Sequence, residues 1–238
     1  ETVSIPGGRD IDVSLYHIDA PSSEAFLSGE PLIGKIQQIL NEKKVNKVIL
    51  FANTRSDCDW IYWKLSTAIR GYQILLHYSS ISKEVREHTE ERFKRLPMAV
   101  CIATSTLELG VDIGDVDAIF FYRAPRSISS FVQRLGRGNR RSTRVVGCGL
   151  IPSYTIDEAP VKIEEEALLF QALFEATESH TLERIPERRL FSVFIQQILS
   201  LGATYEKNSG EAKIDLPPLS RLAHPNFASF VSDESLTE

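Results

Sequence analysis

Short apolar runs alternate along the chain with longer segments in which apolar residues recur every three or four positions. Apolar runs bounded by polar or turn residues predict buried strands, and the longer segments predict helices that cover them. Strands that are apolar throughout are buried on both faces, so the predicted fold class is α/β, a parallel sheet with helices on both faces. The predicted strands are Lys47–Ala52, Gln73–His77, Ala99–Ala103, Val116–Tyr122 and Val145–Ile151.

The segments between these strands carry helix start and stop signals. Ser56 or Asp57 is expected to cap a helix that Gly71 ends, and Ser82 is expected to cap the helix that Pro97 ends. A further strand is predicted where residues 11–18 alternate between apolar and polar. The predicted helices are Pro31–Lys44, Ser56–Arg70, Ser82–Leu96, Ser127–Leu135, Pro160–Ala176 and Leu190–Leu201.

The pattern changes near Ser153, beyond which no further apolar strand is expected. We therefore predict a domain over residues 1–153, with residues 1–30 as a lead-in segment. Residues 154–238 are predicted to be a small, mainly helical extension. From Thr204 onward the chain is polar and holds several prolines, which predicts a loop, a frayed tail or a small incomplete module.

Composition narrows the class of protein. The chain has 238 residues, of which 42% are hydrophobic and 25% charged, so a globular fold is expected. Its apolar runs are far too short to span a bilayer. The three cysteines form no CxxC pair, which argues against zinc and disulfide frameworks and favours a reducing, cytoplasmic location. The chain begins at Glu1 without a methionine, so we expect a fragment of a longer protein.

Positive charge is concentrated in one segment, residues 123–144, which we call the arginine segment. It holds seven arginines and no acid, whereas the rest of the chain has 20 basic and 32 acidic residues. Guanidinium groups pair bidentately with phosphate oxygens. The distribution therefore favours a focused phosphate site rather than a generally basic nucleic-acid coat. A solvated basic turn is the structural alternative.

Two other segments resemble phosphate or metal motifs but lack the required context. Gly29–Lys35 matches half of a phosphate-binding loop, yet Ile36 stands where a hydroxyl should hold magnesium and no buried strand precedes it. We interpret it as a loop that enters a helix. Asp157–Pro160 resembles a helicase acidic box, but it follows the arginine segment, and its acids are better placed to cap a helix.

Polar side chains follow three predicted strands, where open α/β sheets bind ligands. The carboxyl ends of parallel strands share one edge, so these segments are expected to meet along a surface that suits a phosphate-bearing polymer. Taken singly, each segment would more often be a helix cap or a surface charge. The candidates for nucleic-acid contact are Asn53, Thr54, Arg55, Ser79, Thr104, Ser105 and Thr106; His77 is expected to be structural.

Together these segments resemble the second RecA-like domain of superfamily 2 helicases. Residues 48–55 resemble motif IV, residues 104–112 motif V and residues 133–140 motif VI. Residues 77–94 and 104–117 are most similar to the large helicase-related (Lhr) family. The resemblance is strong from Lys47 to about Ile151 and weak over residues 185–203, where it implies the start of a winged-helix module.

The resemblance implies roles for individual residues. Arg137 and Arg140 match the arginine fingers, which reach the γ-phosphate of an ATP that the first RecA-like domain holds with Mg²⁺. Arg134 matches the arginine that organises the cleft, with Gln133 beside it. Asp112 matches the acid near the ribose, and Gly110 allows close backbone approach. Asn139 stands where the motif usually has glycine, which puts the aim of Arg140 in doubt.

The implied function is the second motor domain of an ATP-dependent helicase or translocase, inactive as a fragment. Its implied partners are single-stranded nucleic acid, DNA rather than RNA, and the N-terminal RecA-like domain of the same polypeptide, with no membrane. A non-catalytic, helicase-derived interaction module is the alternative. A small-molecule kinase or a flavodoxin-like redox domain would share the sheet but would not explain the arginine segment.

Overall fold

The computed structural model describes residues 2–4, 10–108, 111–138, 144–156, 159–161 and 164–179. The chain divides into two compact units, Glu1–Glu183 and Arg184–Glu238, and every described residue belongs to the first. The domain boundary predicted at residue 153 and the helical extension beyond it stay predictions. The helix predicted over residues 190–201 lies outside the described residues.

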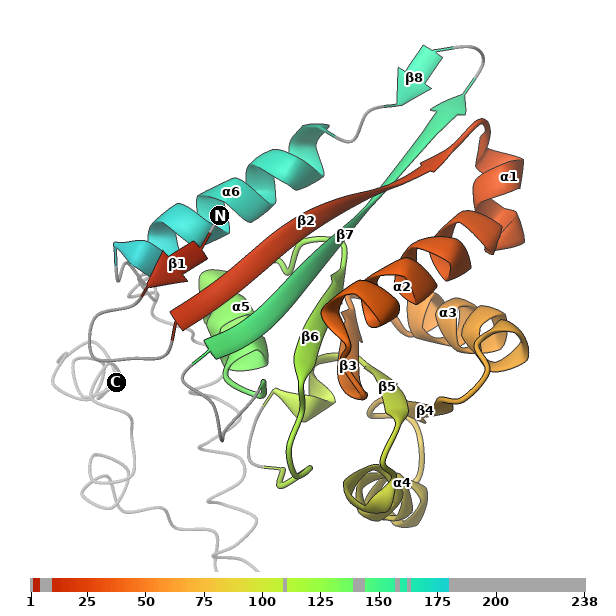
Figure 1. Ribbon diagram of the computed structural model, residues 1–238, viewed down its shortest axis with the longest axis vertical. Helices are drawn as coiled ribbons and strands as arrows, with labels where there is room; N and C mark the ends of the chain where they lie inside the picture. Colours follow the sequence, from red (N-terminus) through yellow and green to blue (C-terminus); the bar gives the residue numbers. More distant parts are fainter. Residues whose placement is uncertain are drawn as a thin grey trace, which may run out of the picture. The chain divides into compact units, whose positions relative to one another are not determined.

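One sheet organises the described unit, in the order β1-β2-β7-β6-β3-β5-β4 with β8 beside β7 (Figure 1). Six neighbouring strands are parallel, while β1 and β8 are short antiparallel additions. The parallel strands are β2 (Asp10–Ala20), β7 (Arg144–Ile156), β6 (Ala118–Tyr122), β3 (Lys47–Ala52), β5 (Ala99–Ala103) and β4 (Gln73–His77). The additions are β1 (Thr2–Ser4) and β8 (Ala159–Val161).

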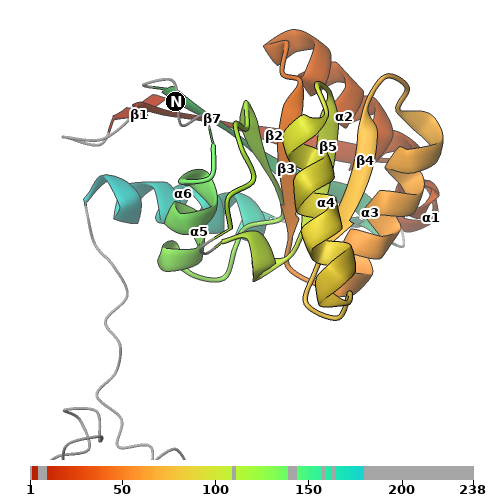
Figure 2. The ribbon, with the colours of Figure 1, turned by 90° about the horizontal axis from the view of Figure 1, so that it is seen from below.

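Helices cover both faces of the sheet, as the apolar strands predict (Figures 1 and 2). Alternate residues of β3 point to opposite cores: Leu50 lies in the core under α1, α2 and α3, and Phe51 in the core under α4, α5 and α6. The helices are α1 (Ser23–Ser28), α2 (Glu30–Lys43), α3 (Arg55–Ala68), α4 (Lys83–Arg95), α5 (Ile128–Leu135) and α6 (Glu164–Glu178), with a 3₁₀ turn η1 at Ser105–Leu107.

The predicted strands at residues 47–52, 73–77 and 99–103 are confirmed to the residue. The predicted strand at 145–151 is longer than expected, because β7 runs to Ile156 and turns back into β8. The helix predicted to begin at Pro160 was placed wrongly: Pro160 pairs with Thr155 in this hairpin, and α6 begins at Glu164. A short strand at the edge of a sheet tolerates proline, because the N–H that proline lacks is not needed there for a hydrogen bond to a neighbouring strand.

The phosphate-loop candidate is mostly helical. This agrees with its interpretation as a segment that enters a helix, and not as a phosphate-binding loop. Gly29 adopts a left-handed conformation with φ of 87° and separates α1 from α2. Gly34 and Lys35 then lie inside α2, which leaves no loop to surround a phosphate. The acids of the second candidate, Asp157 and Glu158, lie outside the described residues.

All three cysteines are buried and unpaired. Cys58 packs under α3, Cys101 lies in β5 and Cys148 in β7. Burial raises the pKa of each thiol, to about 12 for Cys58 and Cys148, so they remain protonated near neutral pH. They act as small core residues and form no disulfide.

Candidate functional site

The carboxyl ends of three neighbouring strands form the edge at which the candidate contacts gather. In the sheet register Phe51 lies opposite Ala103, and Ala103 lies opposite His77. The polar segments that follow these strands therefore start side by side. We call this rim of the sheet the carboxyl edge.

At the end of β3, two of the candidate residues make structural contacts. Asn53 Nδ2 donates to the Ala124 carbonyl at 2.8 Å and so joins the ends of β3 and β6. Thr54, rather than the predicted Ser56 or Asp57, caps α3, and its Oγ1 accepts from Asp57 N at 3.1 Å. The sequence did not identify Thr54 as the cap, because Ser, Asp and Thr are all common N-cap residues. The point at which the backbone becomes helical decides which of them caps the helix.

At the ends of β4 and β5, the exposed candidate residues are Ser79 and Ser105. Arg55 Nη2 donates to Ser79 Oγ at 3.0 Å, and Arg86 Nη1 donates to the Ser79 carbonyl at 2.9 Å. Sequence reasoning missed Arg86, since nothing in a helix of mixed charge distinguishes it. Ser105 is exposed and its neighbour Thr104 is half-buried, so both can be reached from outside.

Thr106 differs from its two neighbours because its hydroxyl points inward. Its Oγ1 lies 3.1 Å from the His77 carbonyl and 2.8 Å from His77 Nδ1, while His77 Nε2 lies 2.9 Å from Glu90 Oε1. An ionised carboxylate only accepts, so Nε2 carries a proton, and the single hydroxyl hydrogen of Thr106 is donated to the His77 carbonyl. Burial lowers the pKa of His77, partly opposed by the hydrogen bond to Glu90.

Arg134 lies at the same edge and is buried in a polar network. Its Nε donates to Glu108 Oε1 at 2.7 Å, and Ser130 Oγ donates to the same oxygen at 2.8 Å. Its Nη1 lies 3.4 Å from Asn53 Oδ1, and its guanidinium stacks 5.0 Å from the centre of the Phe51 ring. This arrangement suits an arginine that organises a cleft, with Glu108 as its counter-charge.

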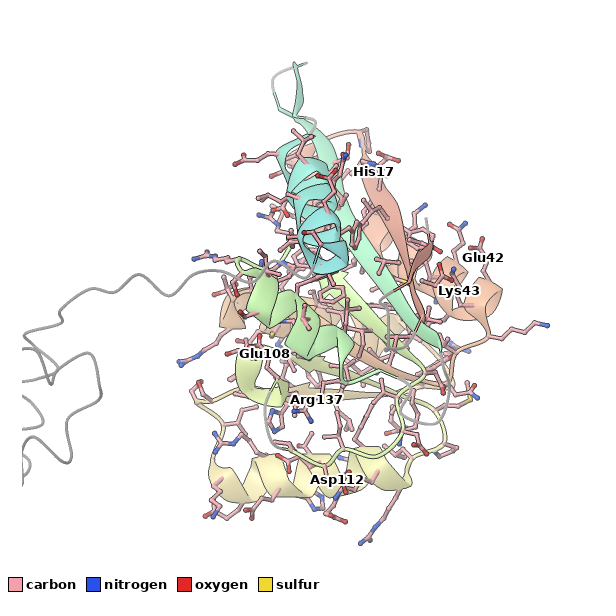
Figure 3. The ribbon with its side chains drawn as sticks, turned by 90° about the vertical axis from the view of Figure 1, so that its left-hand side faces the viewer. His17, Glu42, Lys43, Glu108, Asp112 and Arg137 are labelled. Carbon is pink, nitrogen blue, oxygen red and sulfur yellow. The ribbon has the colours of Figure 1, made fainter. Side chains whose placement is uncertain are left out.

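Arg137 is one turn further along and is also buried. Its Nε and Nη2 donate to the Glu108 carbonyl at 3.1 and 2.7 Å, and Nη1 donates to the Val111 carbonyl at 2.8 Å. Figure 3 shows Glu108 and Arg137 near each other, with Asp112 beyond them toward α4. In this conformation Arg137 holds motif V against motif VI, and a contact with a γ-phosphate would require its side chain to turn outward.

The arginine segment does not stay at the carboxyl edge. Gly138, which follows Arg137, lies against Val145 and Ile119, near the amino ends of β7 and β6. Gln133 is exposed, and Asp112 is exposed beside Lys94, 3.5 Å from its Nζ. Arg140 and Gly110 lie outside the described residues, as does Asn139.

Glu108 is a second site residue that sequence reasoning missed. It was visible only as an acid inside motif V, and nothing in the sequence pairs it with an arginine 26 positions away. Its carboxylate and its carbonyl bind Arg134 and Arg137 respectively. The ion pair is short, and its two side chains are only 6% and 12% exposed.

A pocket of about 450 Å³ opens between the carboxyl edge and α6. Arg123, in its wall, adopts a left-handed backbone with φ of 67°, and its Nε is buried without a hydrogen-bond partner. Glu166 Oε2 accepts from Ala124 N at 2.8 Å and fixes the adjacent wall. Arginines and acidic residues together line this pocket, so its charge favours neither an anionic nor a cationic ligand.

Within the described ranges, no group of three or more His, Cys, Asp or Glu side chains is arranged to hold a metal ion. Over the same residues, no helix is long and apolar enough to cross a membrane.

The parallel sheet with helices on both faces is a RecA-like fold, and comparison with known proteins agrees. Residues 32–142 match the family described as the helicase conserved C-terminal domain. This part of the chain is therefore similar to the C-terminal domain of helicases, and the named relatives of the chain include Lhr-Core helicases.

The ATP-dependent helicase Lhr-Core protein 2 of Thermococcus barophilus is 28% identical over 97% of this chain and 26% of its own length. The ATP-dependent helicase Lhr-Core of Methanocaldococcus jannaschii is 34% identical over 52% of this chain and 14% of its length. The chain therefore spans about a quarter or less of these relatives, both of which are named as ATP-dependent helicases.

Solved structures show the same fold. The helicase Lhr of Mycobacterium smegmatis, bound to ssDNA and AMP-PNP, has a TM-score of 0.60 at 23% identity, over 82% of this chain and 25% of that one. Domain 2 of the DEAD-box helicase Mss116p, bound to an RNA duplex, has a TM-score of 0.51 at 17% identity, over 92% and 85%.

Proposed function

We propose that this chain is the second motor domain of an ATP-dependent nucleic-acid helicase or translocase. The observation that carries the proposal is the packing of motif V against motif VI by Arg134, Arg137 and Glu108. A buried network of this kind fixes where neighbouring guanidinium groups point, and aimed cations stabilise the charge that develops during phosphoryl transfer.

The residues present fit one half of an ATP site. Gly34 and Lys35 are helical and supply no phosphate loop, and the described residues hold no metal cluster. We therefore propose that ATP and Mg²⁺ are bound mainly by a first RecA-like domain of the same polypeptide. ATP supplies the phosphoryl group, while this chain supplies Arg137 and Arg140 as fingers and Asp112 near the ribose, with Arg134, Gln133 and Gly110 shaping the cleft.

Single-stranded nucleic acid, DNA rather than RNA, is the proposed second ligand, at the carboxyl edge. Arg55, Ser79 and Ser105 are the accessible candidates for its phosphates. Thr104 is half-buried beside them. Asn53, Thr54 and Thr106 use their side chains in internal hydrogen bonds, so we propose that they shape the edge rather than bind the strand directly.

The test is Arg137→Ala in the full-length protein. Turnover of ATP should fall at least about a thousand-fold, the scale of a lost arginine finger. Strand affinity should change little, because the Arg137 side chain is buried and donates to the Glu108 and Val111 carbonyls rather than to the exposed serines. Steady-state ATPase and fluorescence anisotropy with a labelled strand measure the two effects.

Arg70→Ala is the matched control, since Arg70 is exposed beyond the carboxyl end of α3 and should leave both quantities unchanged. Wild-type turnover in Arg137→Ala would remove this residue from the mechanism.

A non-catalytic interaction module is the second candidate. It is favoured by the hydrogen bonds that Arg137 makes to two backbone carbonyls, because a purely structural arginine would make the same bonds. A full-length protein that binds strands but hydrolyses no ATP, with or without nucleic acid, would select this candidate.

A further inference from the structure

We propose that the pocket between the carboxyl edge and α6 binds one base of a bound single strand. Its volume of about 450 Å³ lies within the range of about 300–1,000 Å³ that is usual for small-molecule sites. The inference rests on the proposed function, because the base belongs to the strand proposed there as the second ligand. It adds a contact to a base, whereas the candidates Arg55, Ser79 and Ser105 are suited to phosphates.

The wall of the pocket that follows β6 is held in place by three other elements. Ala124 N donates to Glu166 Oε2 at 2.8 Å, and the Ala124 carbonyl accepts from Asn53 Nδ2 at 2.8 Å. Arg123 N donates to the Leu150 carbonyl at 3.0 Å and so continues the pairing of β6 with β7. The segment is therefore bonded to α6, to the end of β3 and to β7, which gives a ligand a pre-formed surface.

The apolar part of the lining suits a flat ring. It comes from the segment after β6, from the start of α5 and from one side of α6. Apolar side chains pack against the faces of a base that has left its stack. The apolar lining residues are Ala124, Pro125, Ile128, Leu169, Ala172 and Leu173.

The polar part of the lining favours a neutral ligand that both donates and accepts. Arg123 and Arg126 supply donors, while Asp57 and Glu166 supply carboxylate acceptors. A base is uncharged, its ring nitrogens and carbonyls accept, and the amino groups of adenine, cytosine and guanine donate. Glu166 uses Oε2 for Ala124 N, so its other oxygen can accept from such an amino group. A phosphate would meet the two carboxylates, which disfavour it.

Arg123 shows two unusual features at this site. Its φ of 67° is left-handed, which is uncommon for a residue other than glycine and is found most often at ligand sites. Among the residues that the structure describes, its Nε is a buried side-chain nitrogen without a hydrogen-bond partner. An unsatisfied donor costs free energy, and a base beside Arg123 brings an acceptor to it, directly or through a bridging water.

The pocket also lies where a strand on the carboxyl edge would pass. The sheet order is β6-β3-β5-β4, with the pocket at the ends of β6 and β3 and the exposed Ser105 and Ser79 after β5 and β4. Neighbouring strands are about 4.8 Å apart, so β6 lies roughly 10 Å along the edge from β5. Thr54 lines the pocket and is followed at once by Arg55, which bonds to Ser79. A phosphate on Arg55 therefore leaves its own or the next base within reach of the pocket.

The experiment measures the affinity of the full-length protein for two strands by fluorescence anisotropy. One is a single-stranded DNA of adenine and cytosine nucleotides, and the other has the same length but lacks every base. Ala172→Trp fills the pocket from an exposed position of α6. It should weaken binding of the intact strand about ten-fold, the scale of one lost base contact, and leave binding of the abasic strand unchanged.

Gln171→Trp is the matched control. It adds the same ring at the neighbouring exposed position of α6, which does not line the pocket, so the affinity for both strands should stay at the wild-type value. Ala172→Trp that weakens both strands equally would overturn the proposal, because the added ring would then obstruct the backbone and not a base. Unchanged or tighter binding of the intact strand by folded Ala172→Trp would overturn it too. Melting temperatures of all three proteins establish that they are folded.

If Ala172→Trp does not fold, Leu169→Trp takes its place, since Leu169 is also exposed and lines the pocket. Calorimetry with adenosine separates the two sources of a base. Adenosine that binds while wild type holds the intact and abasic strands equally would identify a free nucleoside as the occupant and overturn the strand contact. A wild-type protein that binds neither strand would overturn the proposed function as well.

Discussion

At the scale of single residues, contacts decide roles that residue type leaves open. Thr104, Ser105 and Thr106 are three consecutive hydroxyl residues, yet only Thr106 turns inward to His77. Glu108 is one acid among 32 Asp and Glu residues, yet it binds Arg134 and Arg137 of motif VI. Neither distinction is visible in the sequence, because both depend on how the turn after β5 packs against the neighbouring elements.

The lowered pKa of His77 sets the direction in which the stability of this domain changes with pH. Its pKa in the folded protein is below the ordinary 6.5, so the unfolded chain binds more protons as the pH falls. The stability that neutral His77 contributes is present above pH 6.5 and is lost as the pH falls toward its folded pKa. In urea unfolding from pH 8 to 5.5, wild type should lose stability relative to His77→Gln. The variant His88→Gln, at an exposed position of α4, should follow wild type; parallel curves for all three proteins would contradict this.

Two glycines should respond oppositely to alanine. A Cβ on Gly138 would lie 2.9 Å from Val145 Cγ1 and 3.2 Å from Ile119 Cγ1, on stiff β-branched side chains. Gly138→Ala should therefore cost about 1–3 kcal/mol of unfolding free energy. Nothing lies within 4 Å of a Cβ on Gly34, inside α2, so Gly34→Ala should gain about 0.5–1 kcal/mol. Denaturant unfolding of the 238-residue chain measures both, and a loss of stability in Gly34→Ala would show that α2 does not tolerate a methyl group at this position.

At the scale of elements, polar residues at strand ends make structural contacts at the positions where ligand contact is proposed. Thr54 caps α3, and Ser127 caps α5, the helix that carries Arg134. A candidate contact residue can therefore owe its place to the helix that it begins. Asn53 illustrates the same point, since its amide joins the ends of β3 and β6.

Thr54→Ala should lower the unfolding free energy by about 1 kcal/mol, the usual cost of a lost N-cap. Thr54→Ser keeps the oxygen that accepts from Asp57 N and should recover most of the loss. Thermal unfolding followed by circular dichroism gives the comparison. Similar melting of Thr54→Ala and wild type would mean that Asp57 or water satisfies the first turn of α3.

The apolar strands could be predicted because burial on both faces leaves a continuous signal, as in Lys47–Ala52. The hairpin of β7 and β8 could not, because Pro160 serves equally well at a helix start or a strand edge. The sequence could predict that the candidate contacts meet at one edge of the sheet, because the carboxyl ends of parallel strands lie at the same edge. Its internal bonds, such as Arg86 to Ser79, depend on side-chain geometry that spacing does not encode.

At the scale of the whole molecule, the described unit supplies only part of the motor that we propose. It has buried arginines and a proposed strand-binding edge, but its glycine-lysine pair is helical and its described carboxylates form no metal cluster. We therefore expect the purified 238-residue chain to hydrolyse no ATP above background, with or without single-stranded DNA. A coupled-enzyme or phosphate-release assay measures this, and robust turnover by the isolated chain would contradict the proposed division of labour.

The burial of Cys58, Cys101 and Cys148 has a practical consequence for following such a motor at work. Protonated thiols inside a packed core react slowly with maleimides. A cysteine introduced at an exposed position, for example by Trp63→Cys on α3, would therefore take up a fluorophore selectively without removal of the native thiols. Paired with a second dye on the proposed first RecA-like domain, it would report the relative movement that we propose for the two domains in single molecules.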